Sequence, residues 1–185
     1  AIKQASKFLK KNNIYSFNLD SEILMSRVIK KDRKYLILNQ KKQIEYSELK
    51  YYQELVNKRA SGKPIAYLTG NKNFWKYDFK VNENVLIPRP ETELIVEQVL
   101  KLYKNKSKLR ILDIGVGSGC IILSLLKEKK DFLGVGIDKS KKSLDVCNLN
   151  TLNLNLKNRL KLFNFNIDNF SYGKYDVIIS NPPYI

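Results

Sequence analysis

Four residues near the C-terminal end of the sequence combine an amide, two prolines and a phenol: Asn181-Pro182-Pro183-Tyr184. The Asn side chain offers an acceptor oxygen and a donor NH2 group, and the prolines fix φ, which holds the Pro182 carbonyl at a set angle. A planar group with an exocyclic NH2 can donate one hydrogen to the Asn181 oxygen and the other to this carbonyl, while Tyr184 covers its flat face. Asn-Pro also suits an ordinary tight turn. The tetrapeptide alone leaves both interpretations open.

A glycine-rich segment about 60 residues upstream favours the chemical interpretation. It consists of Gly115, Val116, Gly117, Ser118 and Gly119, and it separates an apolar run at 110–114 from another that starts at Cys120. Strand, glycine turn and helix start let a ligand approach the backbone closely and meet unpaired N–H groups. The spacing matches neither the Gly-x-Gly-x-x-Gly of dinucleotide folds nor a phosphate loop with Gly-Lys-Ser/Thr.

A carboxylate follows the glycine segment at the distance expected of a nucleoside site. Asp138 ends the next apolar run, about 20 residues after the glycines, where an acidic side chain can accept from both ribose hydroxyls. Strand, loop, helix, strand and carboxylate together predict a site for a nucleoside-containing cofactor.

These residues resemble the class I methyltransferases that use S-adenosylmethionine, and further segments narrow the resemblance. Residues 58–70 and 85–93 are similar to the linker and cofactor-access motifs of the protein-(glutamine-N5) methyltransferases that modify peptide-chain release factors, the PrmC/HemK family. Residues 19–24, Leu-Asp-Ser-Glu-Ile-Leu, are similar to the helical N-terminal domain of that family. The resemblance runs over the whole sequence in the order of the family.

The resemblance implies a reaction, a cofactor and a set of site residues. It implies transfer of a methyl group from S-adenosylmethionine, which leaves S-adenosylhomocysteine, to the glutamine of a Gly-Gly-Gln motif in a release factor in the cytoplasm. No metal, membrane or direct nucleic-acid substrate is expected. The implied catalytic residues are Asn181, Pro182 and Tyr184, with Pro183 also at the substrate; the implied cofactor contacts are Gly115, Val116, Gly117, Ser118, Gly119, Asp138, Asn169 and Asn181.

Two parts of this assignment stay open. Asn169 stands where the family usually has an apolar or aromatic residue near the adenine, and Phe170 is an alternative contact. Arg89 and Thr92 either face the methionine end of the cofactor or only start a helix.

The order of patterns predicts an α/β protein with three parts. Residues 1–70 have helical periodicity, and the resemblance implies that they form a helical substrate-recognition domain. Residues 71–88 form a β-hairpin linker, whose aromatic and β-branched residues are interrupted by Asn82-Glu83-Asn84. The resemblance implies that residues 89–185 form the N-terminal part of a Rossmann-like class I methyltransferase domain, and we expect this domain to be incomplete at its C-terminus. Its expected elements are a helix from Pro90 to about Tyr103, strands 110–114, 132–137, 160–165 and 175–180, and helices 119–129 and 139–152.

In the class I order, strand 175–180 is the fourth strand and lies next to the first. Its consecutive apolar residues Val177, Ile178 and Ile179 predict a strand covered on both faces. If the chain lacks later strands, the fourth strand is left as a sheet edge.

Charge and side-chain inventory exclude some chemistries. The net charge is +16, but 28 of the 34 basic residues are Lys, they are spread along the chain, and Asn is also abundant at 19 residues, so compositional drift explains the charge better than a nucleic-acid patch. The sequence has no His, which excludes His-based acid–base catalysis and disfavours zinc. Cys120 and Cys147 lack partners at metal-ligand spacing and are expected to be buried structural thiols.

Two other functions fit part of the pattern. Adenine N6 in DNA or RNA is also a conjugated NH2 group, and a flipped base can stack on Tyr184. A non-catalytic fragment or binding module is the second alternative. The motifs at 19–24 and 85–93 favour the release-factor reading over both.

Overall fold

The computed structural model describes residues 1–182. The chain divides into two compact units, one of residues 1–70 and one that begins at Asn71. Within the described residues, no helix combines the length and the apolar character that crossing a bilayer requires.

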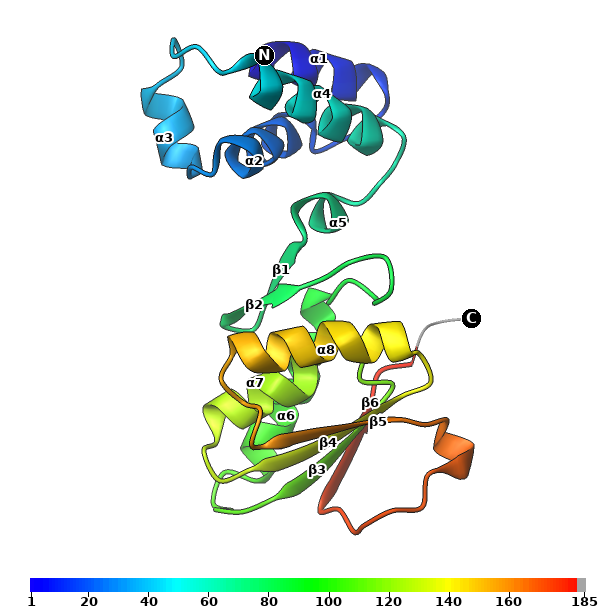
Figure 1. The fold of residues 1–185 in the computed structure, drawn as a ribbon. Helices are drawn as coiled ribbons and strands as arrows, with labels where there is room; N and C mark the ends of the chain where they lie inside the picture. The colour runs from blue at the N-terminus through cyan, green and yellow to red at the C-terminus, as the bar shows by residue number, and fades with distance from the viewer. Residues whose placement is uncertain (183–185) are drawn as a thin grey trace. The chain divides into compact units, whose positions relative to one another are not determined.

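The first unit is helical (Figure 1). Its elements are α1 (Ile2–Lys11), α2 (Phe17–Ile29), α3 (Arg33–Leu38), α4 (Tyr46–Ala60) and α5 (Ile65–Thr69). Helices α1, α2 and α4 bury one shared core that includes Leu9, Leu24, Met25 and Tyr52. Helix α3 buries none of its residues, and two of its apolar side chains, Ile37 and Leu38, are exposed.

A buried polar network joins α2 to α4 in this unit. The Arg59 guanidinium donates from Nε to the Asp20 carboxylate at 2.7 Å, and both side chains are largely buried. Ser16 also donates to Asp20, and the Tyr52 hydroxyl donates to the Ser21 carbonyl at 3.0 Å. Two of the three segments that resemble the family, 19–24 and 58–70, are therefore joined by this contact inside the first unit.

The second unit contains a parallel sheet in the strand order β5-β4-β3-β6 (Figure 1). This order confirms the prediction that strand 175–180 pairs with strand 110–114. The sheet elements are β3 (Arg110–Ile114), β4 (Leu133–Asp138), β5 (Leu160–Asn164) and β6 (Val177–Ser180); the helices are η1 (Pro90–Thr92), α6 (Glu93–Leu102), α7 (Cys120–Glu128), α8 (Lys141–Asn153) and η2 (Ile167–Asn169).

The two faces of the sheet are covered differently. Ile111 of β3 joins the large core formed with α6, α7 and α8, and α7 is buried on all sides from Cys120 to Leu126. Leu112 faces the other way, toward a smaller cluster with Phe170 and Tyr175. The prediction that strand 175–180 is covered on both faces is wrong for the described residues, because Ile178 is 62% exposed. Consecutive apolar residues therefore do not show how many faces of β6 are covered.

The hairpin is present, but its predicted turn is wrong. Strands β1 (Asn71–Phe74) and β2 (Tyr77–Lys80) pair in antiparallel fashion and turn at Trp75-Lys76, not at residues 82–84. Trp75 takes a left-handed φ of 57°, which is rare for a bulky residue. Its backbone N–H donates to Glu93 and its indole N–H to Glu128, and these contacts hold the turn. Phe74 is buried against Phe79, as expected of a hairpin core residue.

Candidate functional site

The carboxyl ends of three neighbouring strands converge at one edge of the sheet. Ile114 of β3 is opposite Ile137 of β4 on one side and Ser180 of β6 on the other. In the sheet, β4 lies next to β3 and β5 lies next to β4, whereas β6 lies on the other side of β3, so the strand order reverses there. Ligands of open α/β sheets bind at such a reversal, outside the carboxyl ends of the strands. The glycine loop and Asn181 directly follow β3 and β6, and Asp138 is the last residue of β4.

The glycine loop is held by hydrogen bonds from its backbone. The N–H groups of Gly115 and Val116 both donate to the Ile137 carbonyl, at 2.9 and 3.0 Å. Gly115 and Gly117 have positive φ values of 71° and 53°, and a Cβ added at Gly115 would meet nothing within 4 Å. At Gly117 the nearest atom to such a Cβ would be the Gly115 carbonyl oxygen, at 3.8 Å. Gly115 and Gly117 therefore border open space that a side chain would otherwise occupy, as expected of a loop that receives a ligand.

The third glycine is required for packing. A Cβ on Gly119 would lie 2.6 Å from the Cys147 sulfur and 2.8 Å from a Leu123 methyl group. Cys120 and Cys147 are both buried free thiols, which confirms the prediction for them. Burial raises the pKa of the Cys120 thiol to about 12. The base of the loop is thus tightly packed, while Gly115 and Gly117 face open space.

Asp138 ends β4 and braces the loop. One carboxylate oxygen accepts from the Gly117 N–H at 3.0 Å, and the other accepts from the Ser140 N–H at 2.8 Å. Each carboxylate oxygen has a second lone pair, and the side chain is only half-buried. Asp138 can therefore support the loop and still accept hydrogen bonds from a ligand.

A second carboxyl group lies beneath the loop, and the sequence argument gave it no role. Asp113 is 2% exposed and alternates with Leu112, so it points to the helix-covered face. Burial raises its pKa to about 8, with the nearby Asp138 adding to the rise and a backbone hydrogen bond from Ile122 opposing it. Within residues 1–182 its Oδ2 atom has no hydrogen-bond partner. A lone carboxyl inside an apolar strand was the signal available in the sequence.

Asn181 is anchored at the same edge. Its Nδ2 group donates to the Thr92 hydroxyl at 3.2 Å, and Thr92 is buried in η1. This bond uses the donor side of the amide and leaves Oδ1 as an acceptor. Pro182 follows and is exposed. The expected roles of Pro183 and Tyr184 lie outside the described residues.

The two residues expected near the adenine, Asn169 and Phe170, lie in different surroundings. Asn169 ends η2 beyond β5 and is exposed. Phe170 packs in an aromatic cluster, with ring centroids 5.8 Å from both Phe165 and Tyr172. It also contacts the cluster around Leu112, on the face of the sheet opposite α7.

Sequence reasoning missed the side chain that links the hairpin to the loop. Asn150 of α8 is 1% exposed, and its Nδ2 group donates to the carbonyls of Lys80 and Ser118, at 3.0 and 2.8 Å. Its Oδ1 atom accepts from the Lys80 N–H at 2.7 Å. No local signal distinguishes this Asn from the other asparagines, because both partners lie far away in the sequence.

The strand order, the helix-covered face and the glycine loop at the carboxyl edge define the fold of the class I methyltransferases. The chain belongs to the methyltransferase small domain family, whose pattern matches residues 90–185. Residues 1–70 match the PrmC N-terminal domain. Within the described residues, no group of three or more acidic or Cys side chains is arranged to hold a metal ion.

Curated relatives match over the full chain. A release factor glutamine methyltransferase of Buchnera aphidicola subsp. Baizongia pistaciae is 41% identical over 187 residues, which cover 100% of this chain and 66% of the relative. The protein of the same name from Clostridium acetobutylicum is 39% identical, with the same coverage of both chains. This chain thus spans just under two thirds of the length of these relatives.

Solved structures resemble about half of the chain. One is a SAM-dependent methyltransferase from Geobacter sulfurreducens in complex with S-adenosyl-L-homocysteine, with 22% identity and a TM-score of 0.42. The match covers 50% of this chain and 36% of that one.

Proposed function

We propose that the protein binds S-adenosylmethionine at the carboxyl edge of the sheet. The open space at Gly115 and Gly117, the half-buried Asp138 carboxylate and the unpaired oxygen of Asp113 fit a cofactor that carries ribose hydroxyls and a cationic amino acid end. The loop backbone, Asp138 and the start of α7 would hold it, with Asn169 as the proposed neighbour of the adenine.

We propose further that Asn181 orients an amide nitrogen for methylation. When bound, S-adenosylmethionine supplies a methyl group on a positively charged sulfur, which is already a strong electrophile. An amide nitrogen is a weak nucleophile because its lone pair is delocalised, so the site contributes mainly orientation. The Asn181 Oδ1 atom and the Pro182 carbonyl accept from the substrate NH2 group and stabilise the positive charge that develops on it. The nitrogen then releases a proton to water, and no side-chain base is needed.

The single observation that carries this proposal is the anchoring of Asn181 to Thr92 beside the glycine loop. Because Nδ2 is engaged by Thr92, the acceptor oxygen is the part of the amide that remains for a substrate. The proposed substrate is the glutamine of the Gly-Gly-Gln motif of a release factor, which the names of the relatives support.

Mass spectrometry of a release factor incubated with the protein and S-adenosylmethionine tests the proposal. We expect a mass increase of one methyl group on that glutamine. Asn181→Ala should abolish transfer while cofactor affinity stays within several-fold, because the lost contacts are made mainly in the transition state. Asn158→Ala, at an exposed Asn near the start of β5, is the matched control and should be fully active. Methylation of adenine in an oligonucleotide, with none on the release factor, would move the assignment to nucleic acid.

A further inference from the structure

A large groove lies in the first unit and contains none of the residues discussed above as a cofactor site. Its volume is about 950 Å³, and α1, α2, α3, the segment before α4 and the start of α4 line it. Met25, Leu36 and Ile44 contribute apolar surface to it, and each belongs to or packs against the core of this unit. The groove is thus a hollow in the helical unit that combines apolar side chains with many polar and charged ones.

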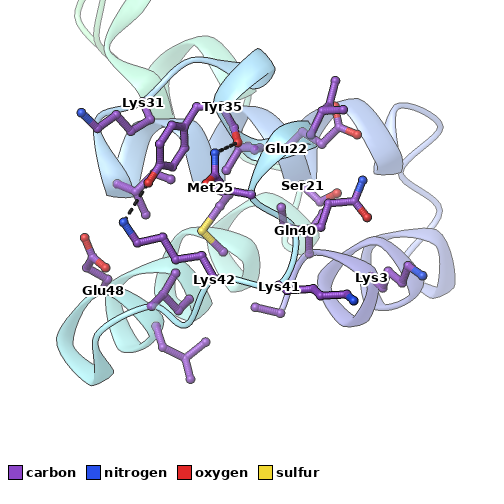
Figure 2. A pocket seen from close by; sticks show the side chains of 18 of the residues that line it. Lys3, Ser21, Glu22, Met25, Lys31, Tyr35, Gln40, Lys41, Lys42 and Glu48 are labelled. Atoms are coloured by element: carbon purple, nitrogen blue, oxygen red, sulfur yellow. Dashed lines mark hydrogen bonds between the residues drawn. The ribbon is translucent and has the colours of Figure 1, made fainter.

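Lysines dominate the charged lining. Lys3, Lys31, Lys41 and Lys42 line the groove, against the two carboxylates Glu22 and Glu48 (Figure 2). Among the described residues, no acidic side chain forms an ion pair with any of these lysines.

Both carboxylates already have local partners. Glu22 accepts from Nε and Nη2 of Arg33, at 2.9 and 2.6 Å. Glu48 accepts from the Glu45 N–H at 3.2 Å as part of the capping box of α4. The hydrogen bond with Tyr35 raises the pKa of Lys42, and attraction by Glu48 adds to the rise. The four lysines nevertheless outnumber the two carboxylates, so the groove keeps a net positive charge and is complementary to an acidic ligand.

Tyr35 lies between two of these lysines. Lys31 and Lys42 lie 5.7 and 5.6 Å from the centre of its ring, and Lys42 donates to its hydroxyl at 2.8 Å. Because the hydroxyl accepts from Lys42, its own hydrogen is available to donate (Figure 2). A carboxylate placed here would meet two cations and one hydroxyl donor.

The composition of the groove favours a protein segment over nucleic acid. Its cations are all Lys, without the Arg side chains that bind phosphates in bidentate fashion. Its apolar lining is mostly aliphatic, with Tyr35 as the aromatic residue. Such a lining suits the apolar face of an amphipathic helix and offers no row of aromatic rings on which a series of bases could stack.

We propose that this groove binds an acidic amphipathic helix of the protein that is methylated. The apolar face of the helix lies against the apolar lining, and its carboxylates meet Lys31, Lys41, Lys42 and the Tyr35 hydroxyl. This inference rests on the proposed function, since it names the part of the enzyme that holds the substrate protein.

Charge reversal in the groove tests the proposal. The variant Lys31→Glu/Lys41→Glu/Lys42→Glu is titrated calorimetrically with an unmodified release factor at about 0.15 M ionic strength, where distant charges are screened. We expect the Kd to rise at least about tenfold, with S-adenosylmethionine affinity unchanged. The control Lys7→Glu/Lys11→Glu/Lys50→Glu makes the same charge change at exposed positions outside the groove and should bind normally.

A neighbouring pair on α3 tests the apolar contact. Ile37 and Leu38 are both exposed, at 59% and 73%, but only Ile37 lines the groove. Ile37→Ser should weaken binding of the release factor several-fold, and Leu38→Ser should not. Neither change removes a buried side chain, so circular dichroism should show both variants folded.

The outcomes separate this proposal from the proposed function. If the groove variants bind the release factor normally and methylate it, the groove proposal is wrong and the proposed function is unaffected. If the groove variants lose binding but the wild type does not transfer a methyl group, the proposed function is wrong and the groove proposal is supported. If the groove variant and the control triple variant lose the same affinity for the release factor, the effect comes from the overall charge of the protein and the groove proposal is wrong. The groove proposal is also wrong if the groove binds a single-stranded RNA and no release factor. If the wild type neither binds nor methylates a release factor, both proposals fail.

Discussion

The two units use their most recognisable sequence motifs in different ways. In the second unit, the glycine segment and Asp138 form a surface that leaves space and acceptors for a ligand. In the first unit, Asp20 and Arg59 of the recognised segments are buried in contact with each other. The lysine-rimmed groove of that unit comes mainly from residues outside those segments. A recognisable motif therefore belongs to the proposed ligand site in one unit and to the internal packing in the other.

The largest expected effect tests the structural role of the buried contact between Asp20 and Arg59. Asp20→Ala should lower the free energy of unfolding of the first unit by about 3–5 kcal/mol, because it leaves the Arg59 charge buried without its partner. Denaturant unfolding measures the loss. Glu22→Ala, which breaks the more exposed pair with Arg33, should cost less than about 1 kcal/mol. Equal losses in the two variants would contradict the distinction.

The next prediction tests whether the glycine segment 115–119 receives the ligand. Gly117→Val should weaken S-adenosylmethionine binding by about 100-fold or more, because a branched side chain at φ 53° is strained and fills the open space. Isothermal titration gives the affinity. Gly62→Val carries a similar backbone penalty, at φ 93° with nothing nearby, but lies in the first unit. It should bind the cofactor normally, and a comparable loss there would point to general destabilisation.

A smaller effect is expected at the end of β4. Asp138→Ala should reduce cofactor affinity by about 1–3 kcal/mol, the range for charge-assisted hydrogen bonds. Part of the loss would come from the loop itself, because Asp138 also accepts from Gly117. Asp145→Ala, at an exposed position of α8, controls for the change in net charge. Matching isotherms for both variants and the wild type would remove Asp138 from the site.

The last prediction concerns pH. The unfolded Asp113 carboxyl releases its proton near its ordinary pKa of 3.8, whereas in the folded protein burial raises that pKa to about 8. The folded state binds more protons in this window, so the contribution of Asp113 to stability should fall as the pH rises from about 4 to about 8. Asp113→Asn should remove this trend. Melting temperatures of the two proteins would then converge or cross with rising pH, while parallel curves would contradict the shifted pKa.

The sequence predicted those parts that depend on local pattern. Alternating strands and helices and the loop between β3 and α7 follow from apolar runs and glycines. The place of β6 beside β3 was predicted from the strand order of the class I methyltransferases that the sequence resembles. The hairpin turn was misplaced because Trp75 is held by Glu93 and Glu128, which are 18 and 53 positions away. The contact between Asn181 and Thr92 spans 89 positions and had no local signal either. Long-range side-chain contacts decide such details after the local elements have formed.

The packing beneath the glycine loop provides a kinetic reporter. The sequence contains only two cysteines, both lie under the loop region, and the Cys147 sulfur occupies the space that a Cβ on Gly119 would need. A thiol reagent reaches such a sulfur only during transient opening, and the raised pKa of Cys120 keeps its reactive thiolate scarce while the protein is closed. The rate of labelling thus reports the fraction of time that the glycine loop is detached from α8, without an introduced cysteine.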